Sequence, residues 1–349
     1  MRVFTLISIL IVLIAWPLAI FAQELPYPDI NQGIDPAPFE RVAMSGWQFL
    51  KLPTDARFAG MGGVTTANSH GDAASALGNP ASIADIENLS VSLNSMNWLV
   101  DTKYQSLAAV KNFGKLGTIG INAVLLDYGD MVRTENQPIY ENGEYTGRAR
   151  SALDLGTVTA NDLAIGLSYA RQVTDRLQVG GNLRYISEEL DDAKTSNWSL
   201  DIGTVYYTGL RTLRIAMVGR NFGPDARFAE YDERIGFPAV EVRMPMSFQL
   251  GAAFDILEGK GDNPHFWTIA AEFAHPNDGP EKVNVGTEYT FMNFATLRGG
   301  YRFNYDEEGL TAGGGLRLVT RAFAFKINYA YMDFGRFDSV SLFSLVFEL

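Results

Sequence analysis

Most of this chain follows one pattern: segments of roughly ten residues in which apolar and polar residues alternate, separated by turn residues. The stretch 246–254 reads Met-Ser-Phe-Gln-Leu-Gly-Ala-Ala-Phe, and 323–331 reads Phe-Ala-Phe-Lys-Ile-Asn-Tyr-Ala-Tyr. Successive side chains of a strand point to opposite faces, so each segment has one apolar, aromatic face and one small or polar face. The pattern runs from about residue 88 to the C-terminus and predicts an all-β structure.

A soluble β-sandwich would also alternate, but its strands are usually about five or six residues long. Most segments here are roughly nine to twelve residues long, which is near the length a tilted strand needs to cross a bilayer. Aromatic residues also gather at the ends of the apolar faces, as interfacial girdles require. Examples are Tyr289, Phe291, Phe303, Tyr305 and Tyr331. We therefore expect a transmembrane antiparallel β-barrel at 88–349.

The segments number about 14, and an even number is what a single-chain bacterial barrel requires. We expect strands near 88–98, 102–113, 116–128, 162–173, 177–188, 197–207, 212–222, 245–254, 265–274, 282–292, 295–305, 310–318, 322–332 and 339–349.

The connections between these segments test the barrel independently, because such barrels have short periplasmic turns and long extracellular loops. The two longest connections, 129–161 and 223–244, are the third and the seventh, whereas the even-numbered connections are mostly short. The eighth connection, 255–264, is an exception whose length the pattern does not explain.

The N-terminus reads as a secretory signal peptide over residues 1–22. Arg2 supplies a positive start, an almost unbroken apolar stretch follows, and Ala22 precedes an abrupt change to polar residues. The alternative is an uncleaved membrane anchor, since the apolar stretch is long enough to span a bilayer. Pro17 and the polar change at Gln23 favour cleavage. We expect export to the bacterial outer membrane.

Residues 23–87 precede the first expected strand. They begin with an irregular, polar lead, and a segment follows that is rich in small residues and lacks alternation. Two motifs stand out in it, and their residues are Gly60, Met61, Gly62, Gly63, Asn79, Pro80 and Ala81. The first motif lacks the Lys-Ser/Thr of a phosphate loop, so close backbone packing inside the barrel is the better account. The second is either an ordinary turn or the tip of a hatch packed against the barrel wall.

Several classes of function find no support. The formal net charge of −12 argues against nucleic-acid binding. The chain has no cysteine, so it has no thiol nucleophile or thiolate metal site. His70, His265 and His275 lack the spacing of metal ligands. Hydrolase motifs are absent, and we expect neither enzymatic activity nor a cofactor.

Two groups of residues remain open to a binding role. The charged residues expected on the lumen face are Glu272, Glu288, Arg298, Arg302, Arg317 and Lys326. They either line a passage or fill the polar interior of an ordinary barrel. The third connection contains Tyr140, Asn142, Gly143 and Tyr145. Their Asn-Gly pattern predicts a hairpin that is either plain loop structure or a contact surface for a partner.

The chain also resembles a known family. Residues 49–63, with Ala56-Arg57 followed by Gly60-Met61-Gly62-Gly63, and then Asn79-Pro80-Ala81, are similar to the opening of the PorV/PorQ family of outer-membrane proteins. Asp55 departs from the glycine usual there. Stretches at 167–171, 179–185, 201–203, 221–223 and 298–301 are also similar, so the resemblance covers nearly the whole mature chain.

The resemblance implies a barrel of the fatty-acid-transporter (FadL-like) type with the N-terminal segment plugging the lumen. It also implies a role in type IX secretion as a shuttle or scaffold. The partners would be the C-terminal domains of secreted cargo and the proteins of a surface attachment complex. The alternative is a FadL-like channel for hydrophobic small molecules. An apolar stripe in the lumen would favour the channel, but the expected lumen face is mostly Gly, Asn and charged residues, which favours secretion.

Overall fold

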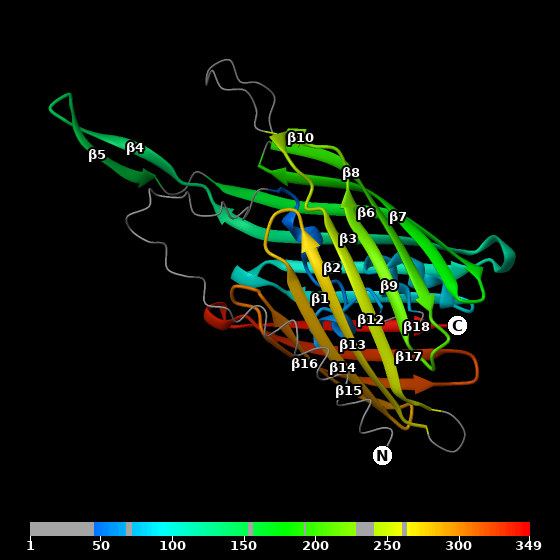
Figure 1. Cartoon of the computed structure of the whole chain (residues 1–349). Coiled ribbons are helices and arrows are strands. Elements are labelled where there is room, and N and C mark those ends of the chain that lie inside the picture. Colours follow the sequence, from blue (N-terminus) through cyan, green and yellow to red (C-terminus); the bar gives the residue numbers. More distant parts are fainter. Residues whose placement is uncertain (1–44, 68–71, 153–155, 192, 228–240, 260–263) are drawn as a thin grey trace, which may run out of the picture. The chain divides into compact units, whose positions relative to one another are not determined.

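The computed structural model describes residues 45–67, 72–152, 156–191, 193–227, 241–259 and 264–349 (Figure 1). The signal peptide expected at 1–22, the lead at 23–44 and His70 lie outside the described residues. Among the residues that the structure describes, none of the helices combines the length and apolarity needed to span a bilayer.

The described strands include a closed antiparallel barrel of fourteen members, as the alternation predicts. In chain order they are β1 (Leu89–Asn97), β2 (Lys103–Asn112), β3 (Thr118–Val132), β6 (Thr157–Thr174), β7 (Leu177–Leu190), β8 (Ala193–Tyr207), β9 (Arg214–Phe222), β12 (Ser247–Glu258), β13 (Phe266–Pro276), β14 (Lys282–Phe291), β15 (Ala295–Phe303), β16 (Leu310–Val319), β17 (Ala324–Asp333) and β18 (Ser339–Glu348). Each pairs with its neighbour along the chain, and β1 pairs with β18 to close the ring.

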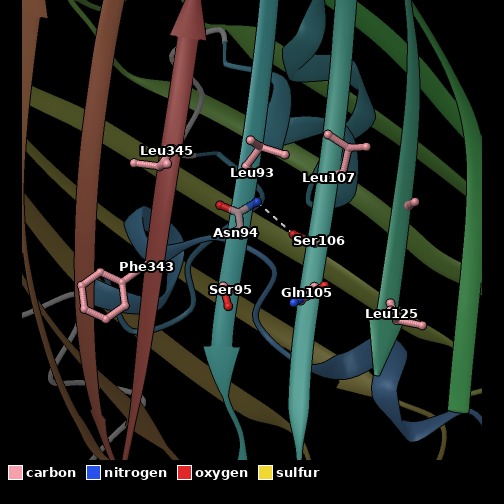
Figure 2. Close-up of a pocket in the computed structure, with 10 residues that line it drawn as sticks. Leu93, Asn94, Ser95, Gln105, Ser106, Leu107, Leu125, Phe343 and Leu345 are labelled. Carbon is pink, nitrogen blue, oxygen red and sulfur yellow. Dashed lines mark hydrogen bonds between the residues drawn. The ribbon is translucent and has the colours of Figure 1, made fainter. Parts of the chain in front are cut away.

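The apolar faces of the strands point outward. On β6, Ile165 and Leu167 are 53% and 57% exposed, whereas Ala164 and Ser168 on the opposite face are fully buried. Figure 2 shows the same arrangement on β1, β2 and β18, where Leu93, Leu107 and Phe343 lie on the outer surface. An exposed apolar belt around a closed ring is suited to lipid and costly in water, so the barrel is a membrane-spanning one.

Two small sheets lie outside the ring. The third connection holds the hairpin of β4 (Glu135–Glu141) and β5 (Glu144–Ala152), and the seventh holds β10 (Ala226–Arg227) paired with β11 (Glu241–Val242). The eighth connection is shorter than expected, because β12 continues to Glu258 past the end that its alternation indicates. This extension shortens the eighth connection to 259–265, which is still the longest of the even-numbered connections.

The described part of the N-terminal segment consists of short helices rather than strands. They are η1 (Gln48–Lys51), α2 (Ala56–Gly60), η2 (Ala73–Leu77) and η3 (Pro80–Asp85). Further single turns, η4 (Leu99–Asp101), η5 (Gly114–Leu116) and η6 (Gly335–Phe337), lie in connections of the barrel. The side chains of α2, η2 and most of η3 are buried against the inward faces of the strands. Residues 45–67 and 72–87 are called the hatch below.

Candidate functional site

The first hatch motif sits against glycines of the barrel wall. A Cβ added to Gly60 would lie 3.1 Å from the Cα of Gly313 on β16, and one added to Gly286 on β14 would lie 2.3 Å from the carbonyl oxygen of Met61. The distance at Gly286 leaves no room for a Cβ, and the distance at Gly60 is tighter than an ordinary contact of a Cβ. The glycines at these positions allow the hatch backbone to touch the wall directly.

Gly62 and Gly63 allow the backbone of this motif to turn. Their φ angles are 72° and 80°, in the left-handed region that favours glycine. The Gly62 amide donates to Thr311 Oγ1 on β16 at 2.9 Å. A Cβ added to Gly300 on β15 would come within 2.2 Å of the same amide nitrogen. The Gly60–Gly63 motif is therefore a packing element, and no feature of it indicates a phosphate site.

The second motif makes equivalent contacts elsewhere on the wall. Asn79 caps η3 and donates through Nδ2 to the carbonyl oxygens of Thr66, at 2.8 Å, and Thr204, at 3.2 Å. A Cβ added to Gly180 on β7 would lie 2.6 Å from both Pro80 and Ala81. In the strand order, β7 is six places from β15, so the two motifs contact nearly opposite sides of the ring. The hatch thus crosses the lumen.

Carboxylates of the wall add polar contacts to the hatch. Glu288 on β14 accepts two hydrogen bonds from Arg57, each of 2.9 Å, and one of 2.6 Å from Arg298 on β15. Glu272 on β13 accepts from the amides of Thr65 and Thr66, at 2.9 and 2.8 Å. A buried carboxylate needs hydrogen-bond donors to offset its loss of water, and here atoms of the hatch provide many of these donors.

A third contact lies at the rim, where Asp278 in the β13–β14 turn pairs with Lys51 of η1 at 2.5 Å. Burial alone would raise the pKa of Asp278. The hydrogen bonds from Lys51, Ser45 and Gln48 outweigh burial and hold that pKa below its ordinary value. The carboxylate of Asp278 is therefore charged and fastens the start of the hatch.

Asp55 is the residue at which the chain departs from the family opening. Its Oδ1 accepts from the amides of Arg57, at 2.7 Å, and Phe58, at 3.3 Å, so it is the N-cap of α2. Its Oδ2 is buried and has no hydrogen-bond partner among the described residues. Burial, and then the nearby charge of Asp72, raise the pKa of Asp55 to about 6.

The hatch lies between two cavities. We define the long-loop end of the barrel as the end at which β1 finishes, and the short-turn end as the end at which β1 begins. A cavity of about 1000 Å³ opens at the long-loop end. Phe58 lines this cavity, whereas the adjacent Arg57 lines a second cavity, of about 930 Å³, at the short-turn end.

The two cavities differ in chemistry. The long-loop cavity has an apolar wall whose residues are Phe49, Leu50, Leu52, Phe58, Leu77, Trp98, Leu99, Val100, Leu126 and Met131. Most of them come from the hatch and from the first connection. The short-turn cavity is lined largely by charged and polar side chains. An apolar molecule therefore finds the larger apolar surface on the long-loop side of the hatch.

The charged residues expected in the lumen all lie on the inward face, and most are paired there. Arg302 pairs with Glu308 and Lys326 with Glu348, besides the contacts of Glu272, Glu288 and Arg298. Arg317 lines the short-turn cavity. The sequence reasoning missed Arg220, which also lines the long-loop cavity. The apolar wall was not predicted either, because most of its residues lie in the hatch and the first connection and not on the strands.

The candidate partner-binding loop is the tip of the β4–β5 hairpin. Asn142 and Gly143 have φ angles of 53° and 86°, as an Asn-Gly hairpin turn requires. Tyr140 and Tyr145 are 61% and 57% exposed, and their ring centroids lie 5.8 Å apart. Within the described residues no cluster of His, Cys, Asp and Glu could hold a metal ion.

A shallow hollow of about 390 Å³ marks the outer wall (Figure 2). Its rim includes Leu93, Leu125 and Leu345, with the outward polar pair Ser95 and Gln105 between them. It lies on the belt that faces lipid, so it does not belong to the lumen site.

Comparison with known proteins identifies structures that share the fold of this chain, but it does not assign the chain to a family. No protein-family model and no curated protein matches the sequence. Among solved structures, the Pseudomonas putida toluene transporter TodX matches with a TM-score of 0.55 at 13% identity, covering 85% of this chain and 97% of TodX. The Ralstonia pickettii toluene transporter TbuX matches with a TM-score of 0.55 at 14% identity, over 85% of this chain and 97% of TbuX.

Proposed function

We propose that this protein is a non-enzymatic channel of the bacterial outer membrane that takes up hydrophobic small molecules and is closed by its hatch. The observation that carries this proposal is the apolar-walled cavity at the long-loop end, whose floor is the hatch itself. Pockets that bind apolar ligands combine such a wall with a few polar groups. The fold shared with two toluene transporters supports the same assignment.

The loop lengths orient the proposed path. Long loops are extracellular and short turns periplasmic in outer-membrane barrels, so the apolar cavity would open to the outside. The hatch fills the ring between the two cavities, and a ligand can pass only if the hatch moves. The contacts that hold the hatch are glycine-to-backbone contacts, apolar packing, side-chain hydrogen bonds and a few ion pairs, which can separate without unfolding a strand.

A disulfide lock tests whether hatch movement is required. A Cβ added to Gly251 on β12 would lie 3.3 Å from the Cβ of Ala67, close to the separation found in disulfides. The chain has no other cysteine, so the double variant Ala67→Cys/Gly251→Cys can form only this bridge. We expect oxidised cells to lose uptake of radiolabelled toluene and reduced cells to regain it.

The two single-cysteine variants are the controls, and both should take up toluene under either condition. Uptake that continues at the wild-type rate in fully bridged protein would show that the hatch does not gate a path. A wild-type protein that neither transports nor retains any hydrophobic probe would remove the channel assignment altogether.

The second candidate is the secretion role that the sequence resemblance implies. The observation in its favour is the β4–β5 hairpin, which presents two exposed tyrosines outside the ring. Exposed aromatic residues are frequent anchors of protein interfaces. Tyr140→Ser/Tyr145→Ser should then reduce surface delivery of cargo proteins in the native bacterium. If deletion of the whole gene leaves that delivery unchanged, the secretion role is wrong.

A further inference from the structure

The short turn between β2 and β3 carries exposed cations at the short-turn end of the barrel. Lys111 lies near the end of β2, and Lys115 lies in the turn itself, within η5. Arg171 lies on β6 beside this turn, because the ladder pairs Ala170 with Thr118, the first residue of β3. All three cationic side chains are exposed. They form a positive cluster in a chain whose formal net charge is −12.

Two of these cations lie on the lipid-facing surface of the ring. Lys111 shares one face of β2 with Leu107, and Arg171 shares one face of β6 with Leu167 and Tyr169, since alternate residues of a strand point the same way. The leucines and the tyrosine are exposed members of the apolar belt. The two cations therefore stand at the edge of the belt, where lipid tails give way to lipid headgroups.

Exposed apolar side chains lie among the cations. Phe113 and Leu116, on either side of Lys115, are 46% and 72% exposed. The turn is fixed against β6, because the Tyr169 hydroxyl donates to the carbonyl oxygen of Leu116 at 2.9 Å. A Cβ added to Gly117 would also lie within 2.7 Å of a β6 carbonyl oxygen. Large apolar groups held out from a fixed turn suit the membrane interface better than open water.

No carboxylate neutralises the three cations within the part of the chain that the structure describes. Neither Glu87, just before β1, nor Asp175, in the next short turn, forms an ion pair with Lys111, Lys115 or Arg171. The Nζ of Lys111 instead lies 5.6 Å from the ring centroid of Phe113. The positive charge of this surface is therefore available to an external anion.

We infer that this surface binds the headgroup of an anionic phospholipid in the bilayer around the barrel. Its residues are Lys111, Phe113, Lys115, Leu116 and Arg171, and they are called the basic patch below. The lipid phosphate would accept charge-assisted hydrogen bonds from the three cations, and the acyl chains would continue along the apolar belt. The occupant is a lipid and not an acidic protein, because the patch is continuous with the surface that lipid covers.

The loop lengths place the basic patch at the periplasmic side of the membrane, since short turns are periplasmic. Basic residues close to a membrane surface attract anionic lipids through charge, and apolar side chains beside them add contact with the interface. The inference needs only the barrel and its lipid-facing belt, so it does not depend on the proposed channel function.

The test measures lipid binding to the full-length protein by native mass spectrometry in detergent. Phosphatidylglycerol and phosphatidylcholine with identical acyl chains are titrated separately, and the dissociation constant of the first bound lipid is determined for each. We expect the wild-type protein to bind the first phosphatidylglycerol at least about fivefold more tightly, the factor for one basic residue at a membrane surface. Lys111→Gln/Lys115→Gln/Arg171→Gln should reduce this preference to less than about twofold.

A second triple variant removes the same positive charge from the long-loop end. It is Lys103→Gln/Arg133→Gln/Lys194→Gln. Arg133 and Lys194 form ion pairs with Asp191 and Glu189, and Lys103 lies opposite an aspartate in the β2–β3 ladder. Because carboxylates already offset these cations, this variant should keep the wild-type preference. Heat-modifiable migration on gels checks that both variants form the barrel.

Three outcomes would overturn the basic patch as a lipid site. The first is equal binding of the two lipids by the wild-type protein, which would leave an acidic protein as the partner to test. The second is a preference for phosphatidylglycerol that survives in the patch variant. The third is an equal loss of preference in both triple variants, because binding would then follow net charge and not the patch.

Discussion

At the scale of single residues, Asp55 links the stability of the hatch to pH. Burial and the charge of Asp72 raise its pKa from 3.8 to about 6, although Arg298 and the capped amides act in the opposite direction. A carboxyl group with a raised pKa stabilises the folded hatch when protonated. That contribution is complete below pH 3.8 and is lost as the pH rises through about 6.

We therefore expect Asp55→Asn to stabilise the hatch at pH 7.5 by up to about 3 kcal/mol and to have little effect at pH 3.5. Asparagine caps helices as well as aspartate does, so the cap itself is preserved. Hydrogen exchange of the amides of residues 57–61, measured at several pH values, reports the change. Asp101→Asn in an exposed loop is the control. If the variant and the wild type show parallel pH profiles, Asp55 does not titrate in this way.

Gly300 and Gly299 offer a matched pair on one strand. A Cβ at Gly300 would meet the Gly62 amide nitrogen at 2.2 Å, whereas one at Gly299 would meet nothing within 4 Å. Gly300→Ala should push the hatch loop from the wall and speed amide exchange at residues 60–63 at least about tenfold, the factor for 1.4 kcal/mol. Gly299→Ala should leave exchange there unchanged. Equal exchange in the two variants would mean that the hatch does not rest on β15.

At the scale of elements, β6 shows how depth in the membrane decides the cost of a charge. Ile165 and Asn161 lie on the same outward face, Ile165 amid the apolar belt and Asn161 towards the long-loop end. Arginine costs about 2–4 kcal/mol at the bilayer midplane and about 0–1 near the interface. Ile165→Arg should therefore destabilise the barrel far more than Asn161→Arg, as urea unfolding in lipid vesicles would measure. Similar losses would argue against lipid contact at this belt.

Alternation made the strands predictable, because lipid on one side and a polar lumen on the other impose it on every strand. It predicted the fourteen-strand ring, including a first strand at 88–98 where the structure has β1 at Leu89–Asn97. It misjudged where strands end. Beyond the membrane, as in β12 near Glu258, neither face meets lipid, so pairing continues without the alternation that marks it.

The cavity was harder to predict for a physical reason. The alternation predicted a lumen face of mostly Gly, Asn and charged residues, which argued against an apolar ligand, but the inward faces of the strands also carry apolar side chains such as Met96, Leu126 and Leu342. The apolar wall is built instead by hatch and loop residues such as Phe58, Leu77 and Trp98, which have no periodicity. Arg220 was missed because no spacing in the sequence encodes which inward side chains of the strands reach the cavity.

At the scale of the whole molecule, the fold inverts the usual distribution of side chains. The outward faces of the strands are apolar, and the interior is held by glycine contacts, by paired charges between hatch and wall, and by apolar clusters that join hatch residues such as Leu77 to inward residues of the strands. An interior of this kind can lose a contact without losing the ring, because the ladder of the fourteen strands is independent of the hatch. Gating and barrel stability should therefore be separable by mutation.

The triad of Arg57, Glu288 and Arg298 allows that separation to be tested. Arg57→Met removes one of the contacts between hatch and wall but leaves Glu288 paired with Arg298 at 2.6 Å, so Glu288 is not left as an unpaired buried charge. Glu288→Gln leaves two buried guanidinium groups without their carboxylate, and breaking a buried ion pair in this way costs about 3–5 kcal/mol. We expect Arg57→Met to raise the frequency of conducting events in planar bilayers at least about tenfold, the factor for 1.4 kcal/mol, with an unchanged midpoint of unfolding. Glu288→Gln should raise conductance and lower the midpoint together. Conductance that stays at the wild-type level in both variants would mean that this ion pair does not hold the lumen closed.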